Sequence, residues 1–133
     1  MLDFLESHKN KLVYLPLIIY WIVLFVATSL PGNDLPNLGV SDKIEHFVAY
    51  FILAIFLNLA LTLQTKFKWL KQKANFASIL IISIYAGLDE LHQIFIPGRS
   101  CDIRDWITDF MATCLAVLLM NMLFRQIKNK TAK

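Results

Sequence analysis

Charged residues are absent from four long stretches of the chain, and these stretches carry the prediction of the fold. No Asp, Glu, Lys or Arg occurs in residues 12–30, 47–63, 74–88 and 110–124. A helix needs about 20 mainly apolar residues to cross the core of a lipid bilayer, and only the first stretch supplies them unaided. Each of the others must include polar residues at one end. We therefore predict spanning helices over about 12–30, 43–63, 74–96 and 105–124.

Composition agrees with this pattern. Of the 133 residues, 57% are hydrophobic, above the roughly 45–50% apolar share of soluble domains. The chain has the length of one domain. We predict an all-α, integral membrane four-helix bundle, with residues 1–133 forming a single transmembrane domain.

Cys101 and Cys114 would lie at different depths in such a bundle, so no disulfide is expected between them.

The basic residues predict the orientation of the bundle. Lys43, Arg99 and Arg104 fall on one side of the four-span order, together with eight of the ten acids. The other ten basic residues fall on the opposite side: Lys9, Lys11, Lys66, Lys68, Lys71, Lys73, Arg125, Lys128, Lys130 and Lys133. Because cytoplasmic loops are enriched in Lys and Arg, both termini are predicted to be cytoplasmic. The basic tail is then a topology signal, and no nucleic-acid partner is expected.

Polar residues at the start of the second predicted span fall on one helical face. Asp42 and Glu45 have the spacing of a capping box, so Asp42 is predicted to cap this helix. Lys43, His46 and Tyr50 lie at positions i, i+3 and i+7, which places them on one side of the helix. We expect these three side chains to face a common neighbour.

The third predicted span carries polar residues well inside the membrane. Glu90 and Gln93 are three positions apart and share a face. In a helix that runs to residue 96, Glu90 lies about 9 Å inside the helix end. A charge at that depth is costly unless it faces the interior of the bundle, pairs with a base or is protonated. Glu90 is therefore predicted to face the other helices.

A predicted turn and a predicted helix cap connect the third span to the fourth. Pro97 and Gly98 predict a turn, which brings Arg99 to the outer side. Asp102 is predicted to cap the fourth helix, with Asp105 three positions later, and Asp105 and Asp109 share a face of that helix. If the helices pack as a bundle, we expect one polar cluster on the outer side, made of His46, Tyr50, Glu90, Gln93, Arg99, Asp105 and Asp109.

Three segments together resemble the VanZ-like family of small bacterial membrane proteins. They are DKIEHFVAYFIL at 42–53, DELHQIFIPGR at 89–99 and DIRDWITDFMA at 102–112, and the resemblance covers about residues 20–120. The family's motif residues correspond to Asp42, Lys43, His46, Tyr50, Glu90, Gln93, Arg99 and Asp105. Two positions depart from the family pattern, because Asp109 stands where an Asn is common and Ala112 where a Gly is common.

The resemblance implies a place in the bacterial envelope and leaves the reaction open. Founding members of the family are associated with reduced susceptibility to teicoplanin, a lipoglycopeptide that acts outside the membrane. We therefore expect a multi-pass protein of the bacterial cytoplasmic membrane, with a role in antibiotic resistance or envelope homeostasis. Its expected partners are membrane lipids, and a lipid-linked envelope precursor or a glycopeptide are further candidates. The oligomeric state stays open.

Two kinds of activity fit the polar cluster. In a binding or shielding protein, the cluster holds a headgroup, and the ligand-binding residues are predicted to be Lys43, Tyr50, Gln93, Arg99 and Asp109. In an enzyme, Glu90 or Asp105 is the general base, His46 an acid or base near neutral pH, and Arg99 a clamp for an anionic headgroup. A metal site of His46, Glu90 and Asp105 has suitable ligand types but no diagnostic spacing, so neither a metal nor a cofactor is expected.

Overall fold

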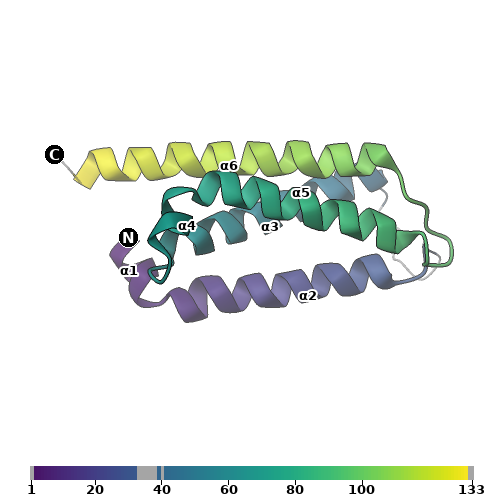
Figure 1. Ribbon diagram of the computed structural model, residues 1–133, viewed down its shortest axis with the longest axis horizontal. Coiled ribbons are helices and arrows are strands. Elements are labelled where there is room, and N and C mark those ends of the chain that lie inside the picture. The colour runs from purple at the N-terminus through teal and green to yellow at the C-terminus, as the bar shows by residue number, and fades with distance from the viewer. Residues whose placement is uncertain (1, 33–38, 40, 132–133) are drawn as a thin grey trace.

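The computed structural model describes residues 2–32, 39 and 41–131, and the described part of the chain is helical with no strand. Figure 1 shows how the helices are arranged. A short π-helical turn, η1, runs directly into the helix that follows it. In chain order the elements are α1 (Leu2–Ser7), η1 (Asn10–Tyr14), α2 (Leu15–Ser29), α3 (Asp42–Leu63), α4 (Lys68–Gln72), α5 (Ala74–Gln93) and α6 (Ile103–Thr131).

Four long helices lie side by side and form a bundle (Figure 1). Each is long and apolar enough to cross a membrane, and the spans are Asn10–Ser29, Asp42–Leu63, Ala74–Gln93 and Ile103–Lys130. The prediction of an all-α four-span bundle is therefore confirmed. Both termini lie at the same end of the bundle, as an even number of spans requires. We call the opposite end, where residues 94–102 connect α5 to α6, the distal end.

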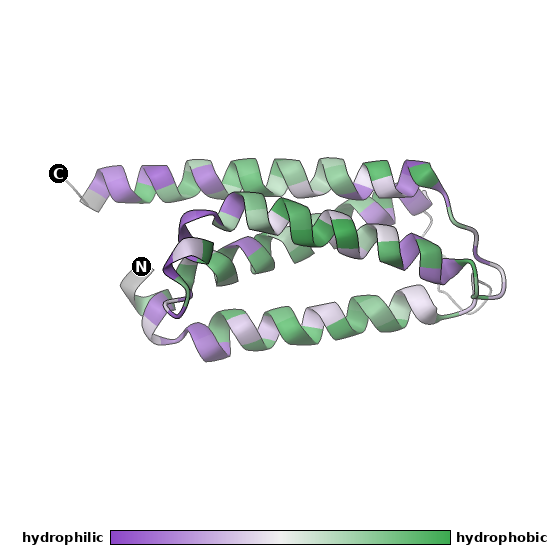
Figure 2. Cartoon of the chain, in the orientation of Figure 1, coloured by the Kyte–Doolittle hydropathy of each residue, from purple (hydrophilic) through white to green (hydrophobic). Residues whose placement is uncertain are grey.

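The core of the bundle contains both large and small apolar residues, and many further large apolar side chains lie on its outer surface. α3 packs against α2, α5 and α6, and Ala54, Ala86, Ala112 and Ala116 lie in the core. Small side chains allow close helix approach in a membrane, where tight packing rather than the hydrophobic effect holds helices together. Many large apolar side chains are exposed around the bundle, and Figure 2 shows polar residues gathered at the two ends. This surface suits contact with acyl chains.

Two helix boundaries differ from the prediction, and one predicted cap is wrong. α5 ends at Gln93 rather than near residue 96, and α6 continues to Thr131. Ser41 occupies the N-cap position of α3, and Asp42 is the first helical residue. Asp42 therefore does not cap α3, although its carboxylate still lies in the first turn, where the helix dipole favours an acid. Most of the predicted connector before α3, residues 33–38 and 40, lies outside the described residues.

A backbone contact joins the two connections at the distal end. The N–H of Gly32, just after α2, donates to the carbonyl oxygen of Pro97 at 3.1 Å. Gly98 has a φ of +75°, a conformation that favours glycine. A Cβ added at Gly32 would lie 2.5 Å from the carbonyl oxygen of Gly98, so only glycine allows this approach. The contact holds the turn before Arg99 against the end of α2.

Gly32→Ala is expected to destabilise the protein by about 1–3 kcal/mol, the usual cost of forcing atoms into a filled space. Gly87→Ala in α5 is the matched control, because its Cβ would meet Trp106 at an ordinary 3.6 Å. Unfolding of both variants in mixed micelles by increasing SDS measures the difference. A Gly32→Ala variant as stable as Gly87→Ala would show that the glycine contact does not hold the turn.

Candidate functional site

Polar side chains from α3, α5 and α6 converge inside the distal end of the bundle. Four carboxylates there are buried, those of Asp89, Glu90, Asp105 and Asp109. Burying a carboxylate is costly unless a cation or hydrogen-bond donors compensate it. The partners of these four groups therefore define what the site can do.

Lys43 and Asp105 form the ion pair closest to the surface. Lys43 Nζ donates to Asp105 Oδ1 at 2.7 Å and lies 3.6 Å from Asp102 Oδ2. The Asp105 side chain is buried, while that of Lys43 is half exposed. Lys43 therefore compensates Asp105 from the edge of the site.

His46 pairs with Asp109 at the centre of the site. His46 Nδ1 lies 3.2 Å and 3.3 Å from the two carboxylate oxygens of Asp109, and both side chains are buried. The His46 ring stacks on Tyr50, with ring planes 3° apart. This arrangement fixes the orientation of the imidazole.

Tyr50 pairs with Asp89, an acid that is not among the predicted site residues. The Tyr50 hydroxyl donates to Asp89 Oδ2 at 3.0 Å, and both residues are buried. The other oxygen, Oδ1, has no hydrogen-bond partner within the described ranges. A sequence signal for Asp89 existed, because Asp89 and Gln93 are four positions apart and share a face of α5.

Glu90 links α5 to the start of α6. Its Oε2 accepts a hydrogen bond from the backbone N–H of Asp102 at 2.9 Å. Asp102 lies directly before α6, and its Oδ1 accepts a hydrogen bond from the N–H of Arg104 at 2.8 Å. This bond holds the pKa of Asp102 below its usual value. Glu90, and not Asp105, therefore accepts the hydrogen bond from the backbone of Asp102 at the start of α6.

Arg99 and Gln93 complete the set of predicted site residues. Arg99 Nη2 donates to the carbonyl oxygen of Ala27 in α2 at 3.3 Å. Its guanidinium makes no salt bridge with any carboxylate that the structure describes. Gln93 is buried, and among residues 2–32, 39 and 41–131 its Nε2 has no hydrogen-bond partner, nor does Arg99 Nε. Both side chains keep donors available for a ligand.

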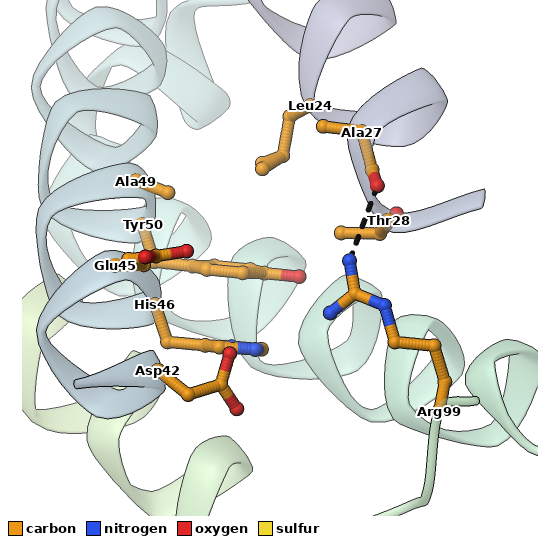
Figure 3. Close-up of a pocket in the computed structure, with 9 residues that line it drawn as sticks. All are labelled: Leu24, Ala27, Thr28, Asp42, Glu45, His46, Ala49, Tyr50 and Arg99. Carbon is orange, nitrogen blue, oxygen red and sulfur yellow. Dashed lines mark hydrogen bonds between the residues drawn. The ribbon is translucent and has the colours of Figure 1, made fainter. Parts of the chain in front are cut away.

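A cavity of about 130 Å³ opens between α2 and α3. Figure 3 shows His46 and Tyr50 projecting from α3 toward Arg99, which reaches across to α2. One wall is mainly apolar and includes Leu24, Ala27 and Ala49. The other residues lining the cavity are Thr28, Asp42, Glu45, His46, Tyr50 and Arg99.

A second, polar cavity of about 330 Å³ adjoins the first and shares Asp42 and Arg99 with it. Lys43, Gln93 and Asp105 also line it. Every residue predicted for the site therefore lies in one of these cavities or in the hydrogen-bonded network beside them.

Comparison with known proteins identifies the family. Residues 7–125 match the model of the family described as VanZ/LLP1. The chain belongs to the VanZ/LLP1 family. This membership and the four apolar helices make it a multi-pass membrane protein.

A relative of the VanZ/LLP1 chain occurs in a eukaryote. An uncharacterized protein of Schizosaccharomyces pombe is 26% identical over 126 residues, which span 94% of this chain and 70% of the relative. No solved structure matches the chain significantly.

The two departures from the VanZ-like pattern have a structural explanation. Asp109, where an Asn is common, supplies the carboxylate that faces His46. Ala112, where a Gly is common, is fully buried in the core, and its small side chain still lets α6 approach its neighbours. The charge added at position 109 is thus matched by the imidazole on α3.

Proposed function

We propose that this VanZ/LLP1 protein binds the headgroup of a membrane amphiphile that carries both a phosphate and an amine. The observation that carries the proposal is Arg99, a partly buried guanidinium that borders both cavities and makes no salt bridge within the described part of the chain. Arginine binds phosphate through charge-assisted, often bidentate hydrogen bonds. Arg99 is therefore the residue expected to hold the phosphate.

The charges around Arg99 favour a headgroup of mixed sign. Asp42 and Glu45 line the same cavity as Arg99, and they would repel a ligand that carries negative charge alone. An ammonium group next to the phosphate would instead pair with these two acids. The apolar wall of Leu24, Ala27 and Ala49 suits the first carbons of an acyl chain.

We place the distal end on the outer face of the bacterial cytoplasmic membrane, with both termini in the cytoplasm. The ten basic residues on the terminal side support this orientation through the preference of Lys and Arg for the cytoplasm. The headgroup would then belong to the outer leaflet or to a lipid-linked envelope precursor.

Cys101 tests this orientation, because it is an exposed thiol in the connection between α5 and α6. A membrane-impermeant maleimide added to intact spheroplasts is expected to label the wild-type chain, and Cys101→Ser is expected to remove the label. Cys114 lies in the apolar part of α6 and should stay unlabelled. Labelling of Cys101 only after lysis would place the distal end in the cytoplasm and contradict the orientation.

The cellular role we propose is protection of the envelope, including reduced susceptibility to lipoglycopeptide antibiotics. The VanZ-like resemblance supports this role. In a strain that lacks the protein, expression of the wild-type chain is expected to restore growth in the presence of a lipoglycopeptide. Expression of Arg99→Gln is expected not to restore it. Arg104→Gln is the matched control, since Arg104 is exposed at the same end and lines neither cavity. Equal protection by Arg99→Gln at equal membrane levels would refute the role of Arg99.

An enzyme is a second candidate, and the His46–Asp109 pair favours it. A histidine held by a carboxylate at Nδ1 while its ring lines a cavity is the arrangement of a general acid or base. Asp105, the alternative base, already pairs with Lys43. The two candidates differ in how protection depends on the number of protein copies. Protection by a binding protein rises in proportion to its copy number. An enzyme protects even when its substrate molecules greatly outnumber the protein.

A further inference from the structure

We propose that His46, Glu90 and Asp109 form a binding site for one divalent metal ion, with Zn²⁺ as the ion that suits the ligands. One nitrogen or oxygen atom of each side chain lies within 4.8 Å of those of the other two, and all three residues are buried. The sequence offers His46 and Glu90 as suitable ligand types, but it gives no diagnostic spacing for the site, because the ligands come from three different helices, and the third ligand is Asp109 rather than Asp105. The inference concerns a different ligand from the proposed headgroup and does not depend on it.

The three residues lie at similar depths in the bundle. His46 is four residues from the start of α3, Glu90 three from the end of α5 and Asp109 six from the start of α6. At about 1.5 Å per residue, these positions are roughly 6, 5 and 9 Å inside their helices. Packing of the helices therefore brings one ligand from each to the same level.

Glu90 provides the observation that points to a ligand. Glu90 is buried, with an exposed fraction of 3%, and its Oε1 has no hydrogen-bond partner in the described parts of the chain. A buried carboxylate oxygen without a donor is costly. Oε2 already accepts from the backbone of Asp102, which leaves Oε1 to coordinate an ion.

The charge balance around Glu90 also favours a cation. Glu90 and Asp109 together carry two carboxylates, whereas His46 supplies at most one positive charge. Lys43, the nearest lysine in the network, is engaged by Asp105 and Asp102. A divalent ion would compensate both acids at once and lower the cost of burying them near the membrane.

A neighbouring group of possible ligands is less suitable. Asp42, His46 and Asp105 are also close enough to share an ion. However, Asp105 Oδ1 already binds Lys43 at 2.7 Å, and Asp42 is exposed. The buried group of His46, Glu90 and Asp109 is therefore the one we assign.

One imidazole and two carboxylates are ligand types that Zn²⁺ accepts, and three protein ligands leave one position of its usual four open. His46 also lines the cavity of Figure 3. A group bound in that cavity would lie beside the ion.

Zinc binding by the untagged full-length chain tests the proposal. The protein is purified in detergent, treated with a chelator, dialysed and titrated with Zn²⁺ by calorimetry, and its zinc content is measured after equilibrium dialysis. We expect one zinc per wild-type chain. Loss of even an outer-shell partner typically weakens metal binding 10–100-fold, so Glu90→Gln and Asp109→Asn should each weaken it by at least about tenfold. Glu6→Gln, an acid near the N-terminus, should bind zinc as the wild type does.

Two further measurements distinguish loss of zinc binding from misfolding and from loss of headgroup binding. Circular dichroism and gel filtration identify variants that do not fold, and zinc should raise the Tm of the wild type but not that of Glu90→Gln. Arg99→Gln should keep the zinc, because Arg99 is not a ligand. The proposal is overturned if zinc leaves the wild-type Tm unchanged, or if folded Glu90→Gln and Asp109→Asn bind zinc as tightly as the wild type.

Discussion

Replacing His46 by alanine is expected to destabilise the bundle by about 3 kcal/mol or more, as removal of one partner from a buried ion pair does. Asp109 would keep its carboxylate in the core, where its exposed fraction is 1%, and would lose the imidazole 3.2 Å away. A neutral hydrogen bond between membrane helices contributes only about 0.6–2 kcal/mol. The size of the loss therefore distinguishes an ion pair from an ordinary polar contact.

SDS-driven unfolding in mixed micelles measures this loss of stability, and a double-mutant cycle shows how much of it comes from the interaction between His46 and Asp109. His46→Ala combined with Asp109→Leu should recover part of the stability, because the pair is then removed whole. His8→Ala is the control, as His8 is exposed near the N-terminus. If the free energy of unfolding of His46→Ala falls by less than about 1 kcal/mol, then an ion pair with His46 does not stabilise the buried carboxylate of Asp109.

Arg99→Gln is expected to lower the affinity for a phosphate-bearing lipid about 10–100-fold, since a hydrogen bond to a charged group contributes about 1.5–3 kcal/mol and each 1.4 kcal/mol is tenfold. The variant keeps an uncharged polar side chain at this position but loses the positive charge that faces both cavities. The fold should persist, because Arg99 makes no salt bridge with the carboxylates described.

Phospholipid retained through detergent purification, quantified by native mass spectrometry, measures this change. Arg104→Gln removes the same charge from an exposed position at the same end and should retain lipid like the wild type. Equal losses in both variants would assign the effect to the general charge of the distal end and not to Arg99.

Hydrophobic patterning was sufficient to predict the fold. The four uncharged stretches correspond to the four helices that are long and apolar enough to cross a membrane, because a membrane requires about 20 apolar residues in each. Boundaries were less predictable. α5 stops at Gln93 although its apolar pattern continues to residue 96, since the turn that contains Pro97 and Gly98 begins before the proline.

Helical spacing predicted which residues share the distal end, but it did not predict their partners. Lys43, His46 and Tyr50 share a face of α3 as expected, yet each pairs with a different acid, and one of these is Asp89. The choice depends on how far α3, α5 and α6 are shifted and rotated relative to one another. Tertiary packing sets these offsets, and no local pattern records them.

The proposed headgroup chemistry is tested most directly by comparing three lipids with identical acyl chains: phosphatidylethanolamine, phosphatidylglycerol and diacylglycerol. Native mass spectrometry of the wild-type chain in detergent gives the affinity for each. Arg99 is expected to bind the phosphate, and Asp42 and Glu45 the amine. The affinity should therefore be highest for phosphatidylethanolamine, lower for phosphatidylglycerol and lowest for diacylglycerol. Arg99→Gln should lower the affinity for both phospholipids to nearly that for diacylglycerol. Equal binding of all three lipids by the wild type would contradict the account.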